Sequence, residues 1–137
     1  MAYRRFLAGF VALAGCAHAY ASPTMVKTSS APDVVFDCVK RQIGVLGYKP
    51  SSLDTEALRV NATKIDLKTR RSDTQFRRIL HKLEVEVAPG ADGQTSLEVV
   101  PHTFGEYTTQ RGPTEVEEKP AEAVTNDAHT LVEACKG

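Results

Sequence analysis

Two stretches of the chain carry apolar residues at the three- and four-residue spacing of an amphipathic helix. The apolar positions are Val35, Cys38, Val39, Ile43 and Leu46 in residues 33–46, and Val124, Ala128, Leu131, Val132 and Cys135 in residues 121–136. Each set forms one stripe, so each segment is predicted to be a helix that turns this stripe toward a core. Gly47 and Pro50 are expected to end the first helix.

Residues 56–67 alternate apolar and polar side chains, as a half-buried strand does. Leu58, Val60 and Ala62 follow one phase, and Ile65 and Leu67 follow the other. The change of phase predicts a β-bulge near residues 61–64, which would return both groups to one face.

A hairpin is predicted after a polar connection at residues 68–74. Residues 75–88 and 94–107 read as its two strands, and the Gly-rich residues 89–93 form the turn. Pro101 is expected to place the later half of the second of these strands at an edge or a bulge. Residues 110–120 are polar and acidic and are predicted to be a loop.

The order α-β-β-β-α predicts an α+β fold. We expect a three-stranded antiparallel sheet with both helices packed on one face, because the strands are consecutive and the helices flank them. At 137 residues and 42% hydrophobic content, the chain has room for one domain, which we place at residues 33–137.

The first residues have the pattern of an export signal. Arg4 and Arg5 precede an uncharged, mostly apolar run from Phe6 to Gly15. Ten helical residues rise roughly 15 Å, about half of a bilayer core, so this run is too short for an ordinary membrane-spanning helix. A basic start, a short apolar run and small residues at its end are typical of a signal peptide.

The end of this run, Leu13-Ala14-Gly15-Cys16, resembles the lipobox of bacterial lipoproteins. The resemblance implies removal of residues 1–15, a diacylglycerol on the Cys16 sulfur and a further fatty acid such as palmitate on the new amine. Ala17 stands where an Asp would retain many such proteins in the inner membrane, so the resemblance implies an outer-membrane anchor facing the periplasm. Residues 16–32 would then be the lipidated N-terminus and a flexible tether. The alternative is ordinary cleavage after Ala21, which would give a soluble periplasmic protein.

Either cleavage leaves Cys38 and Cys135 as the cysteines of the domain. Exported proteins meet an oxidising compartment, so the pair is predicted to form a disulfide that joins the two helices. The sequence has no Cys-x-x-Cys motif, which would have suggested redox activity. The histidines of the domain, His81, His102 and His129, do not have the spacing of metal ligands.

The chain has 17 basic and 17 acidic residues, but they are not evenly distributed. Residues 59–82 have a net charge of +6 and residues 84–137 a net charge of −8. The basic residues of the first segment are Arg59, Lys64, Lys68, Arg70, Arg71, Arg77, Arg78 and Lys82. They predict either a patch for anionic lipid, lipopolysaccharide or an acidic protein, or a solvated sheet face paired with acidic residues. Nucleic acid is not an expected partner.

The sequence contains no Gly-rich phosphate loop, nucleophile elbow or zinc-protease motif. The carboxylate pairs Glu84/Glu86 and Glu117/Glu118 are interpreted as solvation rather than as acid–base pairs. His81 has the phase of the core residues and is either a hydrogen-bonded, half-buried imidazole or the marker of a cavity. His102 and His129 are expected to be exposed. We therefore predict a non-enzymatic envelope protein without a cofactor or a metal, whose partner is the membrane through Cys16 and an unidentified envelope protein or anionic lipid.

Overall fold

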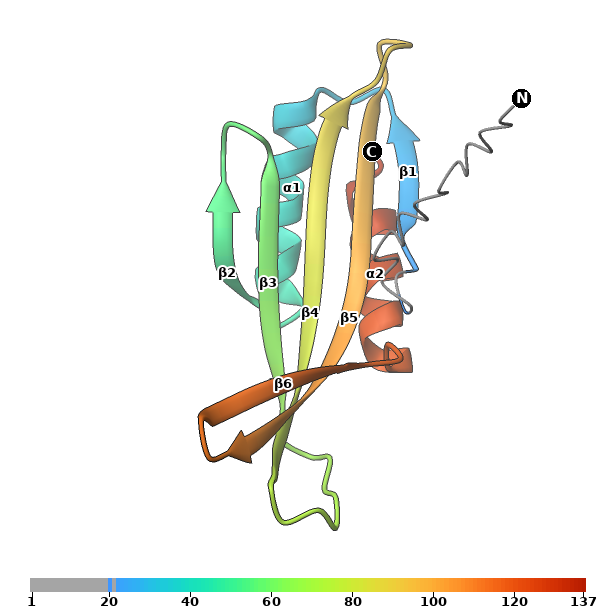
Figure 1. The fold of residues 1–137 in the computed structure, drawn as a ribbon. Helices are drawn as coiled ribbons and strands as arrows, with labels where there is room; N and C mark the ends of the chain where they lie inside the picture. Colours follow the sequence, from blue (N-terminus) through green and yellow to red (C-terminus); the bar gives the residue numbers. More distant parts are fainter. Residues whose placement is uncertain (1–19, 21) are drawn as a thin grey trace, which may run out of the picture.

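The computed structural model describes residue 20 and residues 22–137, and this part forms six strands and two helices (Figure 1). In chain order they are β1 (Thr24–Thr28), α1 (Pro32–Val45), β2 (Lys49–Asp54), β3 (Arg59–Asp66), β4 (Phe76–Pro89), β5 (Thr95–Thr109), β6 (Gly112–Glu118) and α2 (Glu122–Cys135). Both predicted helices are present, and the three predicted strands are β3, β4 and β5. The predicted α-β-β-β-α order is wrong because β1, β2 and β6 extend the sheet to six strands.

All six strands belong to one antiparallel sheet. The strand order is β1-β5-β4-β3-β2, and β6 also pairs with β5. β1 pairs with residues 95–99 of β5, whereas β6 pairs with residues 103–109, so the two short strands occupy the same side of β5 one after the other. Both helices lie on one face of the sheet, as predicted (Figure 1). We call the opposite face, which no helix of the described residues covers, the open face.

The three strands that the sequence did not reveal lack a strong apolar alternation. Every residue of β2 is exposed, and β6 is largely exposed and charged. β1 adds little to the core beyond Val26, which packs at its margin. These edge strands are held by main-chain hydrogen bonds to their neighbours, an interaction that side-chain patterns do not report. The flexible tether predicted for residues 16–32 is accordingly wrong from Thr24 onward, and the loop predicted for residues 110–120 is wrong where β6 forms.

The bulge predicted in β3 does not occur. β3 pairs with β4 in unbroken register from Arg59 opposite Glu86 to Asp66 opposite Ile79. The helix-facing phase that begins with Val60 and Ala62 therefore continues to Lys64, which reaches α2, and Ile65 stays exposed. The change of phase in the sequence reflects an apolar residue left at the surface.

Pro101 lies within β5, opposite Leu83 of β4, and β5 shows no register shift there. Its position falls between the stretch of β5 paired with β1 and the stretch paired with β6. The outer side of β5 is thus unpaired at this point, where a residue without an N–H is tolerated. The prediction for the later half of this strand is wrong in both forms, because residues 103–107 pair with β4 on one side and with β6 on the other, and no bulge occurs at Pro101.

The core lies between the two helices and the sheet. The predicted apolar stripes of both helices face the core, although Cys38 and Leu46 of the first stripe are only partly buried. Gly47 follows α1 with a φ of +85°, the left-handed geometry expected of a helix stop. The largest fully buried side chains are Ile43, Leu83, Leu97, Leu131, Val35, Val39, Val60, Val87, Val99, Val124 and Pro101. No helix of residues 22–137 is long and apolar enough to cross a bilayer.

A disulfide between Cys38 and Cys135 joins α1 to α2, as predicted. The two Cα atoms are 5.6 Å apart and the cysteines are 97 positions apart in the sequence. Cys135 is buried and Cys38 packs against the core, because both lie in the apolar stripes of their helices. The bond therefore closes almost the whole described chain into one loop.

Loss of this disulfide is expected to lower the free energy of unfolding substantially. Closing a loop of 97 residues removes unfolded-state entropy worth roughly 4–5 kcal/mol. The test is urea denaturation of the wild type and of the variant Cys38→Ala/Cys135→Ala, each with and without reductant. Reductant should lower the unfolding free energy of the wild type to a value near that of the variant, and it should leave the unfolding free energy of the variant unchanged. An unchanged unfolding midpoint in the variant would contradict the expectation.

Candidate functional site

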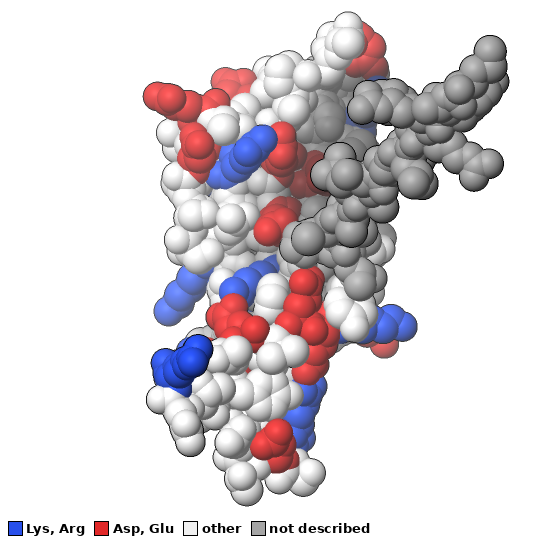
Figure 2. Space-filling model, viewed as in Figure 1, with Lys and Arg blue, Asp and Glu red and all other residues white. Residues whose placement is uncertain are grey.

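The eight basic residues of the segment 59–82 do not gather into one cationic surface. Six of them make ion pairs with acidic side chains of β4, β5, β6 or α2. The pairs are Arg59–Glu86, Lys64–Asp127, Arg71–Glu118, Arg77–Glu106, Arg78–Glu106 and Lys82–Glu115. Lys68 and Arg70 make no ion pair with a described residue. The geometry favours the interpretation as a solvated, paired surface, and Figure 2 shows blue and red side chains interspersed over the face in view.

Arg77 and Arg78 both pair with a glutamate of the neighbouring strand, as the interpretation of a paired sheet face expects. Nε of Arg78 lies 3.2 Å from Oε1 of Glu106 in β5, and Nε of Arg77 lies 3.7 Å from the same oxygen. Glu106 is buried, so both guanidinium groups converge on one carboxylate that is shielded from water. Because Arg77 and Arg78 both pair with Glu106, their positive charges are not free for an anionic partner.

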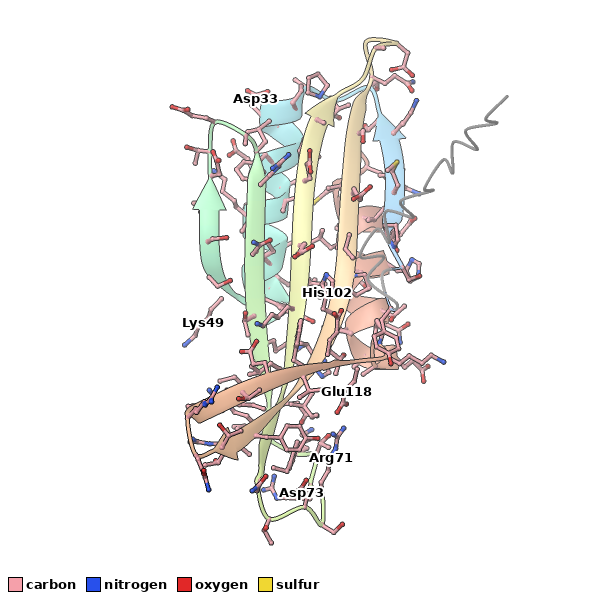
Figure 3. All side chains as sticks on the ribbon, in the orientation of Figure 1. Asp33, Lys49, Arg71, Asp73, His102 and Glu118 are labelled. Atoms are coloured by element: carbon pink, nitrogen blue, oxygen red, sulfur yellow. A yellow bond between two sulfur atoms is a disulfide. The ribbon has the colours of Figure 1, made fainter. Side chains whose placement is uncertain are left out.

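Arg71 holds the β6 hairpin to the loop between β3 and β4 (Figure 3). Its guanidinium donates two hydrogen bonds to the Glu118 carboxylate, donates to the Tyr107 hydroxyl at 2.8 Å, and lies 5.0 Å from the centre of the Phe76 ring. The Arg71 hydrogen bond is the main cause that lowers the pKa of Glu118. A Cβ at Gly105 would lie 2.8 Å from the Tyr107 ring and 2.9 Å from Glu118, so glycine is required for this closure.

Removing the Arg71 side chain is therefore expected to loosen β6. Arg71→Ala should raise amide hydrogen-exchange rates in β6 about fivefold, which corresponds to roughly 1 kcal/mol, the upper end for exposed ion pairs. Arg70→Ala is the matched control, because Arg70 bonds only neighbouring main-chain carbonyls. Exchange rates in β6 that do not differ between the two variants would contradict this role of Arg71.

Lys64, Asp127 and Tyr48 form a polar cluster between β3 and the two helices. Oδ2 of Asp127 accepts hydrogen bonds from the Tyr48 hydroxyl at 2.8 Å and from Nζ of Lys64 at 3.1 Å. Nζ of Lys64 also donates to the Leu46 carbonyl at 3.0 Å. Burial, followed by the bond to Asp127, raises the pKa of Tyr48 far above its usual value. The Tyr48 phenol therefore keeps its proton, which does not suit an acid–base pair. The hydrogen bonds of the cluster instead connect β3 to α2 and to the segment after α1.

His81 is 6% exposed and is hydrogen-bonded, which confirms the first of its two interpretations. Its Nδ1 lies 3.2 Å from the Thr103 hydroxyl, which also accepts the Ala121 N–H at 3.0 Å. Burial lowers the pKa of His81, so the imidazole is neutral at pH 7. Asp66 opposes this shift and Lys64 adds to it.

His81 also lines a hollow, but this hollow lies at the edge of the sheet and is not the cavity under the helices that its second interpretation required. The hollow has a volume of about 500 Å³ and lies beyond Lys49, the first residue of β2, where the edge of β3 after Thr63 is uncovered. Its lining is mainly apolar and comes from the end of β3, from β4 and from the first turn of α2. The lining residues are Lys64, Ile65, Asp66, Leu67, Lys68, His81 and Ala123.

The buried His81 is expected to make the protein less stable in mild acid. The unfolded state binds a proton near the ordinary pKa of 6.5, whereas the folded state binds it only at a lower pH. The His81 contribution is therefore fully present above pH 6.5 and is lost as the pH falls below it. Urea denaturation from pH 7.5 to pH 5 should show a steeper loss in the wild type than in His81→Gln. His129→Gln, which alters an exposed histidine, should retain the wild-type slope, and equal slopes in all three proteins would contradict the assignment.

His102 was expected to be exposed, and this expectation is wrong. It is 7% exposed on the open face, with Nδ1 2.8 Å from Oε1 of Glu117 (Figure 3). Its Nε2 lies 3.3 Å from Oε2 of Glu84, at an angle that does not make a hydrogen bond. The sequence placed His102 in a solvent-facing phase of β5, but β6, the strand that covers it, was not foreseen.

The two carboxylate pairs have different arrangements. Glu84 and Glu86 lie on the open face, as predicted, and both are exposed. Glu117 and Glu118 are neighbours in a strand and therefore point to opposite faces, Glu117 toward His102 and Glu118 toward Arg71. Within residues 22–137 no group of three or more His, Cys, Asp or Glu side chains is placed to hold a metal ion.

The predicted lipidation residue Cys16 and the signal peptide at residues 1–15 lie outside the described residues. The sites that the structure does describe are the disulfide, the ion-paired basic residues and the hollow beside His81. Comparison with protein-family models found no match to the chain, and comparison with the curated proteins found none.

Proposed function

We propose that this chain is a small lipid-anchored protein of the bacterial cell envelope that acts through contacts rather than through catalysis. The observation that carries the proposal is the Cys38–Cys135 disulfide, which is the type of bond that persists in an oxidising compartment. It agrees with the export signal and with Leu13-Ala14-Gly15-Cys16, which resembles a lipobox. Sorting to the outer membrane, facing the periplasm, is the part of the proposal that rests on Ala17.

The position of β1 in the sequence limits how far the domain can lie from a membrane that holds Cys16. β1 begins at Thr24, eight residues after Cys16. Eight residues span at most about 29 Å when fully extended. An anchor on Cys16 would therefore hold the domain close to the membrane surface, since fewer residues separate Cys16 from the sheet than the predicted tether of residues 16–32 supplies. A protein held in this way suits contacts with membrane-bound partners or with the lipid itself.

A non-catalytic role is supported by how the reactive side chains are used. Lys64, Asp127 and Tyr48 bond one another, and the Tyr48 hydroxyl keeps its proton. His81 is held by Thr103, and Arg71 is held by Glu118. Each of these groups is engaged in joining two elements of the fold, so none of them is poised as a nucleophile or a base.

Substitution of Cys16 tests the anchor directly. In a Gram-negative host, the wild type should sediment with membranes and Cys16→Ser should shift to the soluble fraction, because the lipid attachment atom is lost. Ala21→Arg is the matched control: it should leave processing and membrane retention unchanged if Cys16 is the first mature residue. Retention of Cys16→Ser in the membrane, or failure of processing in Ala21→Arg alone, would favour the soluble periplasmic alternative.

A further inference from the structure

The hollow beside His81 carries two of the large apolar side chains that the fold leaves at the surface. Ile65 is 45% exposed and Leu67 is 72% exposed, and both line the hollow. Exposure of neighbouring apolar side chains around a concavity is typical of a binding site rather than of an ordinary surface. The volume of about 500 Å³ lies within the range of small-molecule sites, roughly 300–1,000 Å³.

Most polar groups of the hollow already have partners, and Nε2 of His81 is the exception among the described residues. His81 is buried, neutral and bonded to Thr103. The ammonium group of Lys64 is directed to Asp127 and to the Leu46 carbonyl. A hydrocarbon placed here would therefore take few polar atoms away from water, and the main cost of filling a polar cavity would fall on Nε2 of His81.

The rim of the hollow is cationic. Oδ1 of Asp66 accepts the Lys68 N–H at 2.7 Å, and Oδ2 accepts the Thr69 hydroxyl at 2.6 Å, so this carboxylate is turned to its own loop. Lys68 lines the hollow, and Arg70 donates to the Leu67 carbonyl at 2.6 Å, beside the lining. These are the two basic residues of the segment 59–82 that make no ion pair with a described residue.

We propose that the hollow binds a single-chain amphiphile with an anionic head, its hydrocarbon chain against Ile65 and Leu67 and its head group at Lys68 and Arg70. The apolar lining and the cationic rim together select this chemistry, because an uncharged chain would not use the rim and a small anion would not use the lining. The proposal does not depend on the lipid anchor, so it stands or falls independently of the proposed function.

The experiment is a calorimetric titration of the chain carrying Cys16→Ser, purified without detergent. The probes are dodecanoate and dodecyl phosphate below their micelle concentrations, which distinguish a fatty-acid head from a phosphate head, with dodecyl maltoside as the uncharged comparison. We expect saturable binding of at least one anionic probe, weaker binding of the maltoside, and weaker anionic binding as salt rises. Absence of saturable binding by both anionic probes would overturn the proposal.

Two variants and two matched controls locate the binding. Leu67→Gln and Lys68→Glu should each weaken anionic binding at least fivefold, and both residues are exposed enough for the fold to tolerate the change. Leu53→Gln in β2 and Lys27→Glu in β1 make the same changes at exposed positions away from the hollow and should leave the affinity unchanged. Thermal melts verify that all four variants are folded. Equal losses in variants and controls, or wild-type affinity in Leu67→Gln, would show adsorption elsewhere and contradict the site.

Discussion

The antiparallel pairing of β4 with β5 is the constraint on which the rest of the structure depends. It runs from Phe76 opposite Tyr107 to Pro89 opposite Thr95, and the other strands add to it: β3 on β4, and β1 and β6 on β5, with β2 following β3. Because side chains alternate along both strands, this register sends Val85 and Val99 to the helices and leaves the open face to charged residues.

The helices are bound to this sheet by a modest apolar layer and to each other by a covalent bond. A domain of this size buries a limited apolar core, so packing alone contributes limited stability. The disulfide between the first and the last helix adds to it. The bond also couples the two ends of the described chain, since α1 follows β1 and α2 follows β6. The polar cluster of Lys64, Asp127 and Tyr48 joins the same helices to β3.

Charge that is segregated in the sequence becomes mixed in the fold. Antiparallel strands bring the basic residues of β3 and β4 beside the acidic residues of β4, β5 and β6, so Arg59 meets Glu86 and Lys82 meets Glu115. Lys68 and Arg70 lie in the loop after β3, away from these pairs. The basic residues of the segment that make no ion pair with a described residue thus lie just after β3, beside the exposed Ile65 and Leu67.

The sequence by itself determined the two helices, their inward-facing apolar stripes, the long hairpin and the disulfide, because each follows from local periodicity or from counting cysteines. Only the tertiary structure decided the six-stranded sheet, the burial of His102 and the pairing of the basic residues. β1, β2 and β6 form through main-chain hydrogen bonds to distant strands, and polar side chains at an edge give no periodic signal of that pairing. His102 contacts Glu117 of one of those strands, and the hollow lies where β2 leaves the last residues of β3 unpaired. These features depend on contacts between segments far apart in the chain, which a local pattern cannot encode.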